Sequence, residues 1–210
     1  MILIGQYDSP FVRRVAVALN LYETAFEHRP WSTFREAEKI APFNPLRRVP
    51  TVVLDDGEVM IESGAILDYL DECAGPDRAL FPASGAERRR ALKLAALATG
   101  LAEKAVSLVY ERVLHEQVSV AWTERCRTQI AEVLAVLEAY RADHAAPFFH
   151  GETPGHADVA LACALRFLRE AHPDLFDEER WPALAEHARR AEALAAFAAC
   201  VQPFSGPART

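Results

Sequence analysis

Residues 51–64 read TVVLDDGEVMIESG and carry the clearest structural signal in the chain. Two short apolar runs, rich in β-branched residues, flank the Asp-Gly pair, and this pattern predicts a β-hairpin. Beyond it the apolar spacing changes, because Ile66, Leu70 and Cys73 share one helical face. The segment therefore predicts two antiparallel strands followed directly by a helix over 63–73.

The sequence before this hairpin adds further alternating elements. Residues 2–6 are an apolar strand candidate. Ser9-Pro10 opens a helix, since Ser is a favoured N-cap and Pro suits the first helical position. A second strand is expected at 25–29 and a short helix at 34–40. Residues 1–78 are thus predicted to form one small domain with the element order βαβαββα.

The rest of the chain has the character of a helical domain. No proline occurs between Pro82 and Pro147, and proline breaks helix interiors, so this region can hold long helices such as 86–114. The run 159–165 is apolar on every side, which predicts a helix at the centre of a bundle. A final Ala-rich helix is expected over 182–200.

The expected fold class is α+β with two domains, an α/β domain at 1–78 and an all-α helical bundle at 86–203. Of the 210 residues, 51% are hydrophobic and 25% are charged, as in ordinary globular proteins. The net charge of −7 argues against nucleic acid as a partner. No apolar run approaches the roughly 18 residues of a membrane span, and the start of the chain lacks a basic leader. No membrane partner and a cytoplasmic location are therefore expected.

The cysteines and histidines form no metal or redox motif in the sequence. Cys73, Cys126, Cys163 and Cys200 are far apart, so neither a CxxC pair nor a zinc ribbon is present. The seven histidines lack metal-binding spacing. No metal is expected, and scattered cysteines suggest a reducing compartment. The three tryptophans are interpreted as packing residues.

Three loop segments of the first domain carry candidate chemistry. Ser9 lies at a helix start, where free N–H groups and the helix dipole favour an anion such as a thiolate. In the loop 44–50, a cis Val49-Pro50 bond would expose the Val49 backbone to an extended peptide. Ser63 can cap the next helix, whose N-terminus suits a carboxylate, and Glu62 suits an ammonium, so together they fit an α-amino acid. Each segment also has a simpler interpretation: an N-cap, a turn, and a capped helix with a surface Glu.

Together these segments resemble the cytosolic-type glutathione S-transferases. The motifs are SPFVRRV at 9–15, NPLRRVPT at 44–51 and ESGAI at 62–66. The Ser-Pro-Phe start is similar to that of the tau class, whereas omega-class members carry Cys-Pro-Phe, and small bacterial members look most similar. The resemblance covers nearly the whole chain and implies that the first domain is thioredoxin-like.

The resemblance implies that the first two motifs hold the cysteinyl part of glutathione. Ser9 would be the catalytic hydroxyl, with Phe11 in the same site. Val49 would pair backbone to backbone with the cysteinyl residue, ahead of a cis Pro50. Some classes use a tyrosine hydroxyl near this place, so Tyr7 is a rival to Ser9, although a packing role at the strand end is favoured for it.

Charged and hydroxyl groups would hold the two ends of the tripeptide. Glu62 and Ser63 would bind the γ-glutamyl end. Arg48 matches a position where family members often place a basic residue near the glycyl carboxylate, and Arg35 is a second candidate for that role.

One departure from the family pattern concerns the predicted buried helix. Its start usually reads Ser/Thr-x-x-Asp, whereas here residues 155–158 read GHAD. Asp158 is kept and the capping hydroxyl is missing, although Gly is a tolerated N-cap.

The function implied by the resemblance is glutathione S-transferase activity, in which glutathione thiolate attacks a small hydrophobic electrophile. The electrophile site is expected between the domains along the helix 87–114, where Lys104, Ser107 and Tyr110 are spaced to share a face. The family commonly dimerises, so a homodimer is expected. Two alternatives stay open. One is a binding or regulatory protein of this fold with little turnover. The other is a glutathione-dependent peroxidase or thiol reductase, which would favour Cys at position 9.

Overall fold

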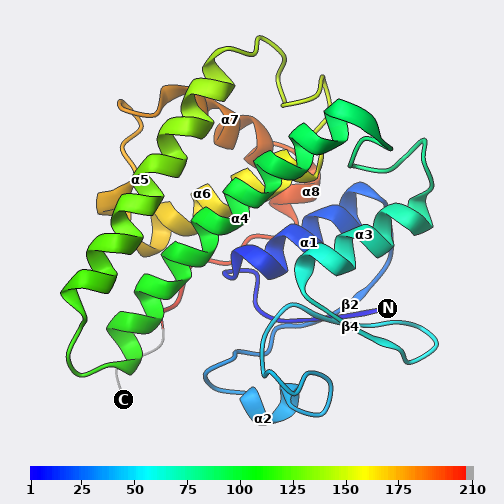
Figure 1. The fold of residues 1–210 in the computed structure, drawn as a ribbon. Coiled ribbons are helices and arrows are strands. Elements are labelled where there is room, and N and C mark those ends of the chain that lie inside the picture. The colour runs from blue at the N-terminus through cyan, green and yellow to red at the C-terminus, as the bar shows by residue number, and fades with distance from the viewer. Residues whose placement is uncertain (207–210) are drawn as a thin grey trace.

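The first part of the chain contains a mixed four-stranded sheet in the computed structural model, which describes residues 1–206 (Figure 1). Its strands are β1 (Ile2–Ile4), β2 (Glu27–Arg29), β3 (Thr51–Val53) and β4 (Val59–Ile61). They lie in the order β2-β1-β3-β4, with β1 parallel to β2 and antiparallel to β3. β3 and β4 pair antiparallel, so the predicted hairpin is confirmed.

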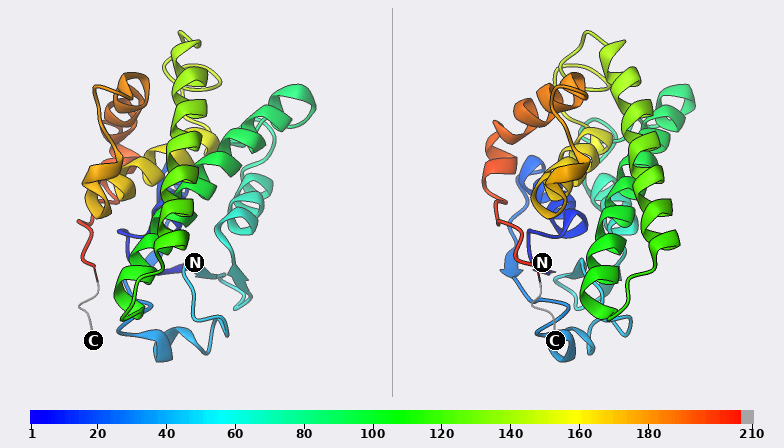
Figure 2. Two further views of the ribbon diagram at one scale, coloured as in Figure 1. Left: turned by 60° about the vertical axis from the view of Figure 1, so that its left-hand side comes forward. Right: turned by 90° about the vertical axis from the view of Figure 1, so that its left-hand side faces the viewer.

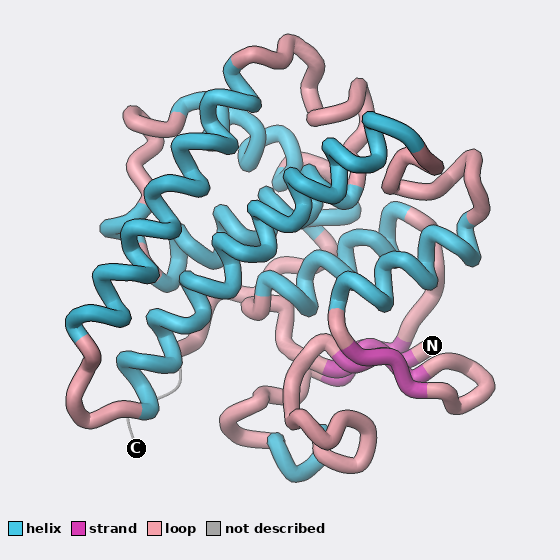
Figure 3. Tube along the Cα trace, viewed as in Figure 1, coloured by secondary structure: helices cyan, strands magenta, loops and turns pink. Residues whose placement is uncertain are grey.

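Helices lie on both sides of this sheet. α1 (Pro10–Leu21) and α3 (Ser63–Ala74) pack together on one side, and the short α2 (Ala37–Ile40) lies on the other (Figure 3). The order βαβαββα is the predicted one. The first two strands are shorter than expected, and α2 begins later. Glu36 Oε2 accepts a hydrogen bond from the Ser32 N–H at 2.8 Å, which holds the chain before α2 in a turn.

The remainder of the described chain is helical, as expected. Its elements are α4 (Gly85–Leu114), α5 (Val120–Ala142), α6 (His156–Ala171), the 3-10 turn η1 (Pro173–Leu175), α7 (Pro182–Glu192) and α8 (Ala195–Ala198). Every residue of 156–165 is buried, and α6 packs against α4, α1 and α7 (Figure 2). The prediction of a central buried helix is therefore confirmed. Among the described residues, no helix is both long enough and apolar enough to span a bilayer.

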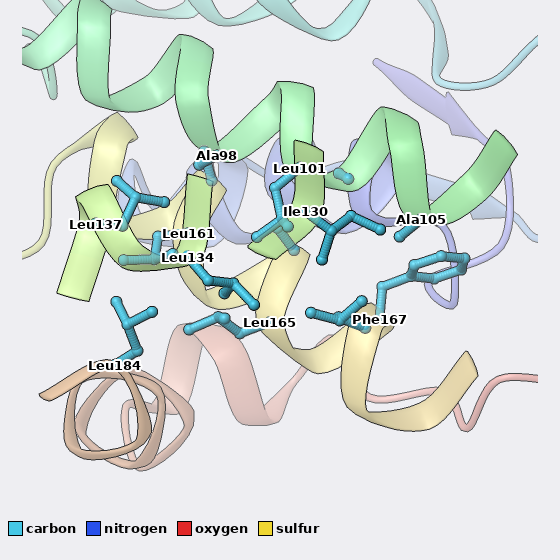
Figure 4. Packing of buried hydrophobic residues seen from close by; sticks show 14 of the residues in the cluster. Ala98, Leu101, Ala105, Ile130, Leu134, Leu137, Leu161, Leu165, Phe167 and Leu184 are labelled. Carbon is cyan, nitrogen blue, oxygen red and sulfur yellow. The ribbon is translucent and has the colours of Figure 1, made fainter. Parts of the chain in front are cut away.

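Two apolar clusters hold the molecule together. Figure 4 shows the first, in which buried side chains of four helices interdigitate. Its labelled members are Ala98, Leu101 and Ala105 of α4, Ile130, Leu134 and Leu137 of α5, Leu161, Leu165 and Phe167 of α6, and Leu184 of α7. The second cluster joins α1 and α3 to α6, for example through Leu19, Leu67 and Val159. This second cluster contains residues of both the sheet-containing part and the helical part, so these two parts pack against each other through apolar side chains.

A buried carboxylate also links the two parts. Asp71 of α3 accepts hydrogen bonds from the Leu80 N–H at 2.9 Å and the Phe81 N–H at 3.2 Å, both in the linker. It also accepts from His156 Nε2 at 2.9 Å and from the Tyr22 hydroxyl. Burial opposes its ionisation, but the hydrogen bonds from His156 and Tyr22 hold the pKa of Asp71 below its usual range. One side chain thus connects α1, α3, the linker and α6.

The final helix predicted over 182–200 is interrupted. α7 ends at Glu192, and Leu194 is extended, with φ −76° and ψ 139°. The reason lies in α1. Arg13, which is 1% exposed, forms a bidentate ion pair with the Glu192 carboxylate at 2.6 and 2.7 Å. It also donates a hydrogen bond to the Cys200 carbonyl at 2.8 Å. A straight helix would separate residues 192 and 200 by about 12 Å along its axis, so a single guanidinium could not bind both of them without the break.

The missing hydroxyl at the start of α6 has a steric explanation. Asp158 accepts hydrogen bonds from the Gly155 N–H at 2.9 Å and the Phe149 N–H at 2.8 Å. A Cβ at Gly155 would lie 2.8 Å from the Leu80 carbonyl oxygen. The linker therefore leaves no room for a serine or threonine at this position.

Restoring the family's hydroxyl should consequently destabilise the protein. Gly155→Ser is expected to lower the free energy of unfolding by about 1–3 kcal/mol, the usual cost of overpacking. Gly100→Ser in α4 is the control, because a Cβ there meets nothing within 4 Å. Urea denaturation should show a lower midpoint for the first variant only. An unchanged midpoint for Gly155→Ser would mean that the linker moves to make room for the side chain, and that the Leu80 carbonyl does not exclude a Cβ at this position.

Candidate functional site

Ser9 caps the first helix, as predicted. Its backbone is extended, with φ −71° and ψ 123°, and its Oγ accepts a hydrogen bond from the Val12 N–H at 3.4 Å. Pro10 occupies the first helical position. A hydroxyl can accept one bond and donate another, so the Ser9 O–H is available to an anion.

Gly5 brings the start of α1 against the loop that contains Val49. It has φ +131°, a conformation suited to glycine. A Cβ at this position would lie 2.5 Å from Val12 Cγ2 and 2.8 Å from Val49 Cβ. The absence of a side chain at Gly5 therefore lets two of the predicted motifs meet.

The second motif is organised by Asn44, which is 1% exposed. Its Nδ2 donates to the Arg48 carbonyl at 2.9 Å and to Thr51 Oγ1 at 3.1 Å, and its Oδ1 accepts from the Leu46 N–H at 3.0 Å. The Val49-Pro50 bond is cis, as the resemblance implied. Three hydrogen bonds from one buried amide thus fix the loop that presents the Val49 backbone.

The third motif differs from its expected geometry. Glu62, with φ +68°, takes the N-cap position of α3, and Ser63 is the first helical residue. The prediction that Ser63 caps α3 is therefore wrong. Its Oγ instead accepts a hydrogen bond from Arg14 Nη1 at 3.5 Å. The Glu62 side chain is 61% exposed, and its Oε1 lies 3.6 Å from Nη1 of Arg48.

Two adjoining cavities bring the motifs together. The smaller is lined by Phe11, Asn44, Arg48, Val49, Pro50, Glu62 and Ser63. The larger includes Ser9 and Arg35, and the two share Phe11, Arg48 and Val49. All seven residues predicted for the glutathione site from the motifs thus line one cavity or both, as does Arg35.

The larger cavity is rich in aromatic side chains. They come from the loop before α2, from α4 and α6 and from the end of the described chain: Trp31, Phe34, Tyr110, Phe167 and Phe204. Of these, only Tyr110 was predicted for this region. Trp31, interpreted as a packing residue, packs near Phe43 with the ring centroids 6.1 Å apart and also lines the cavity. In sequence these rings are indistinguishable from core aromatics, because only the fold brings them together.

Two residues predicted for the electrophile site point elsewhere. Lys104 Nζ pairs with Glu103 at 3.0 Å and lies over the Trp122 ring, while Ser107 Oγ donates to the Glu103 carbonyl. Neither residue lines either of the two cavities described above. The face of α4 that does consists of Val106, Val109 and Tyr110. Of the three residues predicted for the electrophile site, Tyr110 is the one that lines the larger cavity.

Tyr7 is also outside both cavities. Its ring stacks on His28 with the centroids 3.9 Å apart. Burial, with a contribution from Cys200, raises the pKa of Tyr7 to about 12. These features support the packing role over the role of thiol activator.

The cavity wall carries charge but no cluster suited to a metal. Arg35, Arg48 and Asp8 line the larger cavity. Burial raises the pKa of Asp8, while its carboxylate accepts a hydrogen bond from the Ser205 N–H at 3.5 Å. Within residues 1–206, no group of three or more His, Cys, Asp or Glu side chains is arranged to hold a metal ion. The polar groups of this wall include the Ser9 hydroxyl at a helix N-terminus, two arginine side chains and the Asp8 carboxylate.

Comparison with known proteins gives consistent matches. The model of the glutathione S-transferase N-terminal domain matches residues 3–78, and that of the C-terminal domain matches residues 120–190. The uncharacterized GST-like protein YibF of Escherichia coli (strain K12) is 32% identical over 169 residues, covering 80% of this chain and 82% of YibF. Glutathione S-transferase U17 of Arabidopsis thaliana is 29% identical over 198 residues, covering 89% of this chain and 83% of its own.

Solved structures match along almost the whole chain. A glutathione S-transferase from Methylobacterium radiotolerans, in complex with glutathione sulfonate, has a TM-score of 0.90 and 27% identity, covering 99% of this chain and 96% of its own. A glutathione transferase family member from Pseudomonas fluorescens Pf-5, with bound glutathione, has a TM-score of 0.81 and 32% identity. The match covers 97% of this chain and 99% of that protein. With the thioredoxin-like first domain, the helical second part and these matches, the chain belongs to the glutathione S-transferase family.

Proposed function

We propose that this protein is a glutathione S-transferase that holds glutathione in the smaller cavity and directs its thiolate at an electrophile in the larger one. The observation that carries the proposal is the junction of the two cavities at Phe11, Arg48 and Val49. Ser9 lies at the start of the same helix as Phe11 and lines the larger cavity. The relative from Pseudomonas fluorescens, at 32% identity, has glutathione bound.

The task of the site is to ionise a thiol. A free thiol with a pKa near 8.5 is only about 3% thiolate at pH 7, and lowering the pKa by about two units makes roughly three quarters ionised. That shift corresponds to about 2.7 kcal/mol. A hydrogen bond from the Ser9 hydroxyl to the anion supplies about 1.5–3 kcal/mol, and the N-terminus of α1 adds about 0.3–1 kcal/mol. Together these two groups supply about 1.8–4 kcal/mol, a range that spans the value required.

The other motif residues position the tripeptide. The Val49 backbone pairs with the cysteinyl residue, which places the sulfur beside Ser9. Glu62 binds the γ-glutamyl ammonium, and Ser63 with the N-terminus of α3 binds its carboxylate. Arg48, with Arg35 further along the cavity wall, takes the glycyl carboxylate.

The aromatic lining of the larger cavity favours a small hydrophobic electrophile. Reduction by the protein's own thiol is disfavoured, because none of the four cysteines lines either cavity. Calorimetry with glutathione, followed by a broad electrophile panel on the same preparation, tests the proposal. Binding with conjugation supports it. Binding without any turnover favours a regulatory protein, and turnover confined to peroxides favours a peroxidase.

Glu62→Ala should weaken glutathione binding. Loss of a charge-assisted hydrogen bond to the ammonium is expected to cost about 1.5–3 kcal/mol, or roughly 10- to 150-fold in Kd. The matched control is Glu38→Ala, since Glu38 is also exposed and pairs with the loop arginine Arg47, at 2.6 Å, but lines neither cavity. Isothermal titration calorimetry should separate the two variants. Equal dissociation constants for Glu62→Ala and the wild type would remove this assignment.

The protein is expected to be a homodimer with two-fold symmetry, as members of the family commonly are. The surface offers apolar side chains for such a contact, among them Leu46 and Leu92, which are 58% and 42% exposed. Sedimentation equilibrium should show twice the chain mass of 23.3 kDa at micromolar concentration. A species of one chain mass under these conditions would contradict the expectation.

A further inference from the structure

Two adjacent arginines of α1 are both buried but have opposite surroundings. Arg13 is 1% exposed and is matched by the carboxylate of Glu192 at 2.6 Å. Arg14 is 5% exposed, and no carboxylate of the described residues lies within ion-pair distance of it. Its Nε is buried and has no hydrogen-bond partner within residues 1–206. A buried cation without a counter-ion is costly, so its retention calls for an explanation.

The side chain of Arg14 reaches the wall of the smaller cavity. Its Nη1 lies 3.5 Å from Oγ of Ser63, which is itself 5% exposed and lines that cavity at the N-terminus of α3. Cys163 also acts on Arg14 electrostatically, but burial raises the pKa of that thiol to about 12, so it is no counter-ion. Burial lowers the pKa of Arg14 to about 10, so the guanidinium is still charged at pH 7. The structure thus places an uncompensated positive charge directly behind Ser63.

We propose that Arg14 is a positioning residue for a ligand carboxylate, which supplies its missing counter-ion at Ser63. This rests on the proposed function and extends it to a residue outside both cavity linings. Because Ser63 Oγ accepts from Arg14, its own hydrogen is left to donate to a ligand in the cavity that Ser63 lines. The guanidinium strengthens that hydrogen bond by polarising the hydroxyl, and its charge adds to the partial charge of the helix N-terminus. The carboxylate of the γ-glutamyl group is the matching anion.

The test compares two ligands that differ only in that carboxylate: glutathione and 4-aminobutanoyl-cysteinyl-glycine. Calorimetry gives the ratio of their dissociation constants for the wild type and for Arg14→Met. The wild type should prefer glutathione, and Arg14→Met should reduce this preference by roughly tenfold or more, with the affinity for the analogue nearly unchanged. Arg14→Lys should keep part of the preference, because the positive charge is retained.

Arg13→Met is the matched control on the same helix. It removes the ion pair with Glu192, so it should lower stability while leaving the ligand ratio as in the wild type, whereas Arg14→Met removes an unpaired charge. If Arg14→Met does not fold, Arg14→Gln takes its place, with the same expected loss of preference.

The outcomes separate this inference from the proposed function. A wild-type preference that persists unchanged in Arg14→Met or Arg14→Gln overturns the role of Arg14, as does a parallel loss of affinity for both ligands. A wild type that binds neither ligand overturns the proposed function itself.

Discussion

Ser9→Ala is expected to raise the pKa of the bound glutathione thiol by about one to two units, since it removes one hydrogen bond of about 1.5–3 kcal/mol to the thiolate. If the wild type holds the thiol near pKa 6.5, the thiolate fraction at pH 7 falls roughly 3- to 25-fold, and conjugation falls with it. Glutathione affinity should change much less, because the γ-glutamyl contacts remain. Ultraviolet titration of the bound thiolate and the pH–rate profile measure the shift.

Two controls isolate the role of the hydroxyl. Ser119→Ala removes a comparable N-cap, whose Oγ accepts from the Trp122 N–H at 3.3 Å, at a position outside both cavities. It should reproduce any loss of helix stability without moving the thiol pKa. Tyr7→Phe tests the rival hydroxyl and should leave the titration in place. A shift with Tyr7→Phe and none with Ser9→Ala would reverse the roles, and no shift with either would leave thiolate stabilisation to the helix dipole.

Asp71→Ala is expected to lower the free energy of unfolding by about 3–5 kcal/mol, the usual cost of removing one partner from a buried polar network. Four donors lose an acceptor at once: the Tyr22 hydroxyl, His156 Nε2 and the N–H groups of Leu80 and Phe81. Of these, the Leu80 N–H also donates to the Tyr22 hydroxyl, at 3.1 Å. Such a loss is a large part of the roughly 5–15 kcal/mol that stabilises a typical protein. Urea denaturation followed by circular dichroism measures it.

Asp68→Ala is the matched control on the same helix. The Asp68 side chain is 76% exposed and lies 3.6 Å from Arg88, so its removal should cost at most about 1 kcal/mol. The pKa of Asp71 is held below its usual range, so its contribution is present above the unfolded pKa of about 3.9 and is lost as the pH falls through the folded pKa. The difference in the free energy of unfolding between the wild type and Asp71→Ala should therefore become smaller below about pH 4. Equal losses for the two variants at pH 7 would contradict the role of Asp71 as the link between the parts of the molecule.

The features that sequence predicted correctly are those made by neighbours along the chain. The hairpin depends on residues 51–61, and the cap of α1 depends on Ser9 and the N–H three residues later. The central helix α6 follows from an apolar run that no surface helix could carry. The candidate residues of the glutathione site could be predicted because each of the three motifs is a short contiguous segment.

Only the tertiary structure decided the features that depend on residues far apart. Arg13 and Arg14 are identical neighbours in sequence, yet Arg13 forms an ion pair with Glu192 whereas Arg14 donates a hydrogen bond to Ser63. The exclusion of a hydroxyl at Gly155 comes from the Leu80 carbonyl, 75 positions earlier.

The interruption of the last helix and the aromatic lining of the larger cavity have the same origin. The break after Glu192 depends on Arg13, and Trp31 and Phe204 meet in one cavity from opposite ends of the chain. Helix and strand periodicities extend over a few residues, so they report which face of an element is apolar. Which distant charge, carbonyl or ring meets that face is set by the packing of the elements.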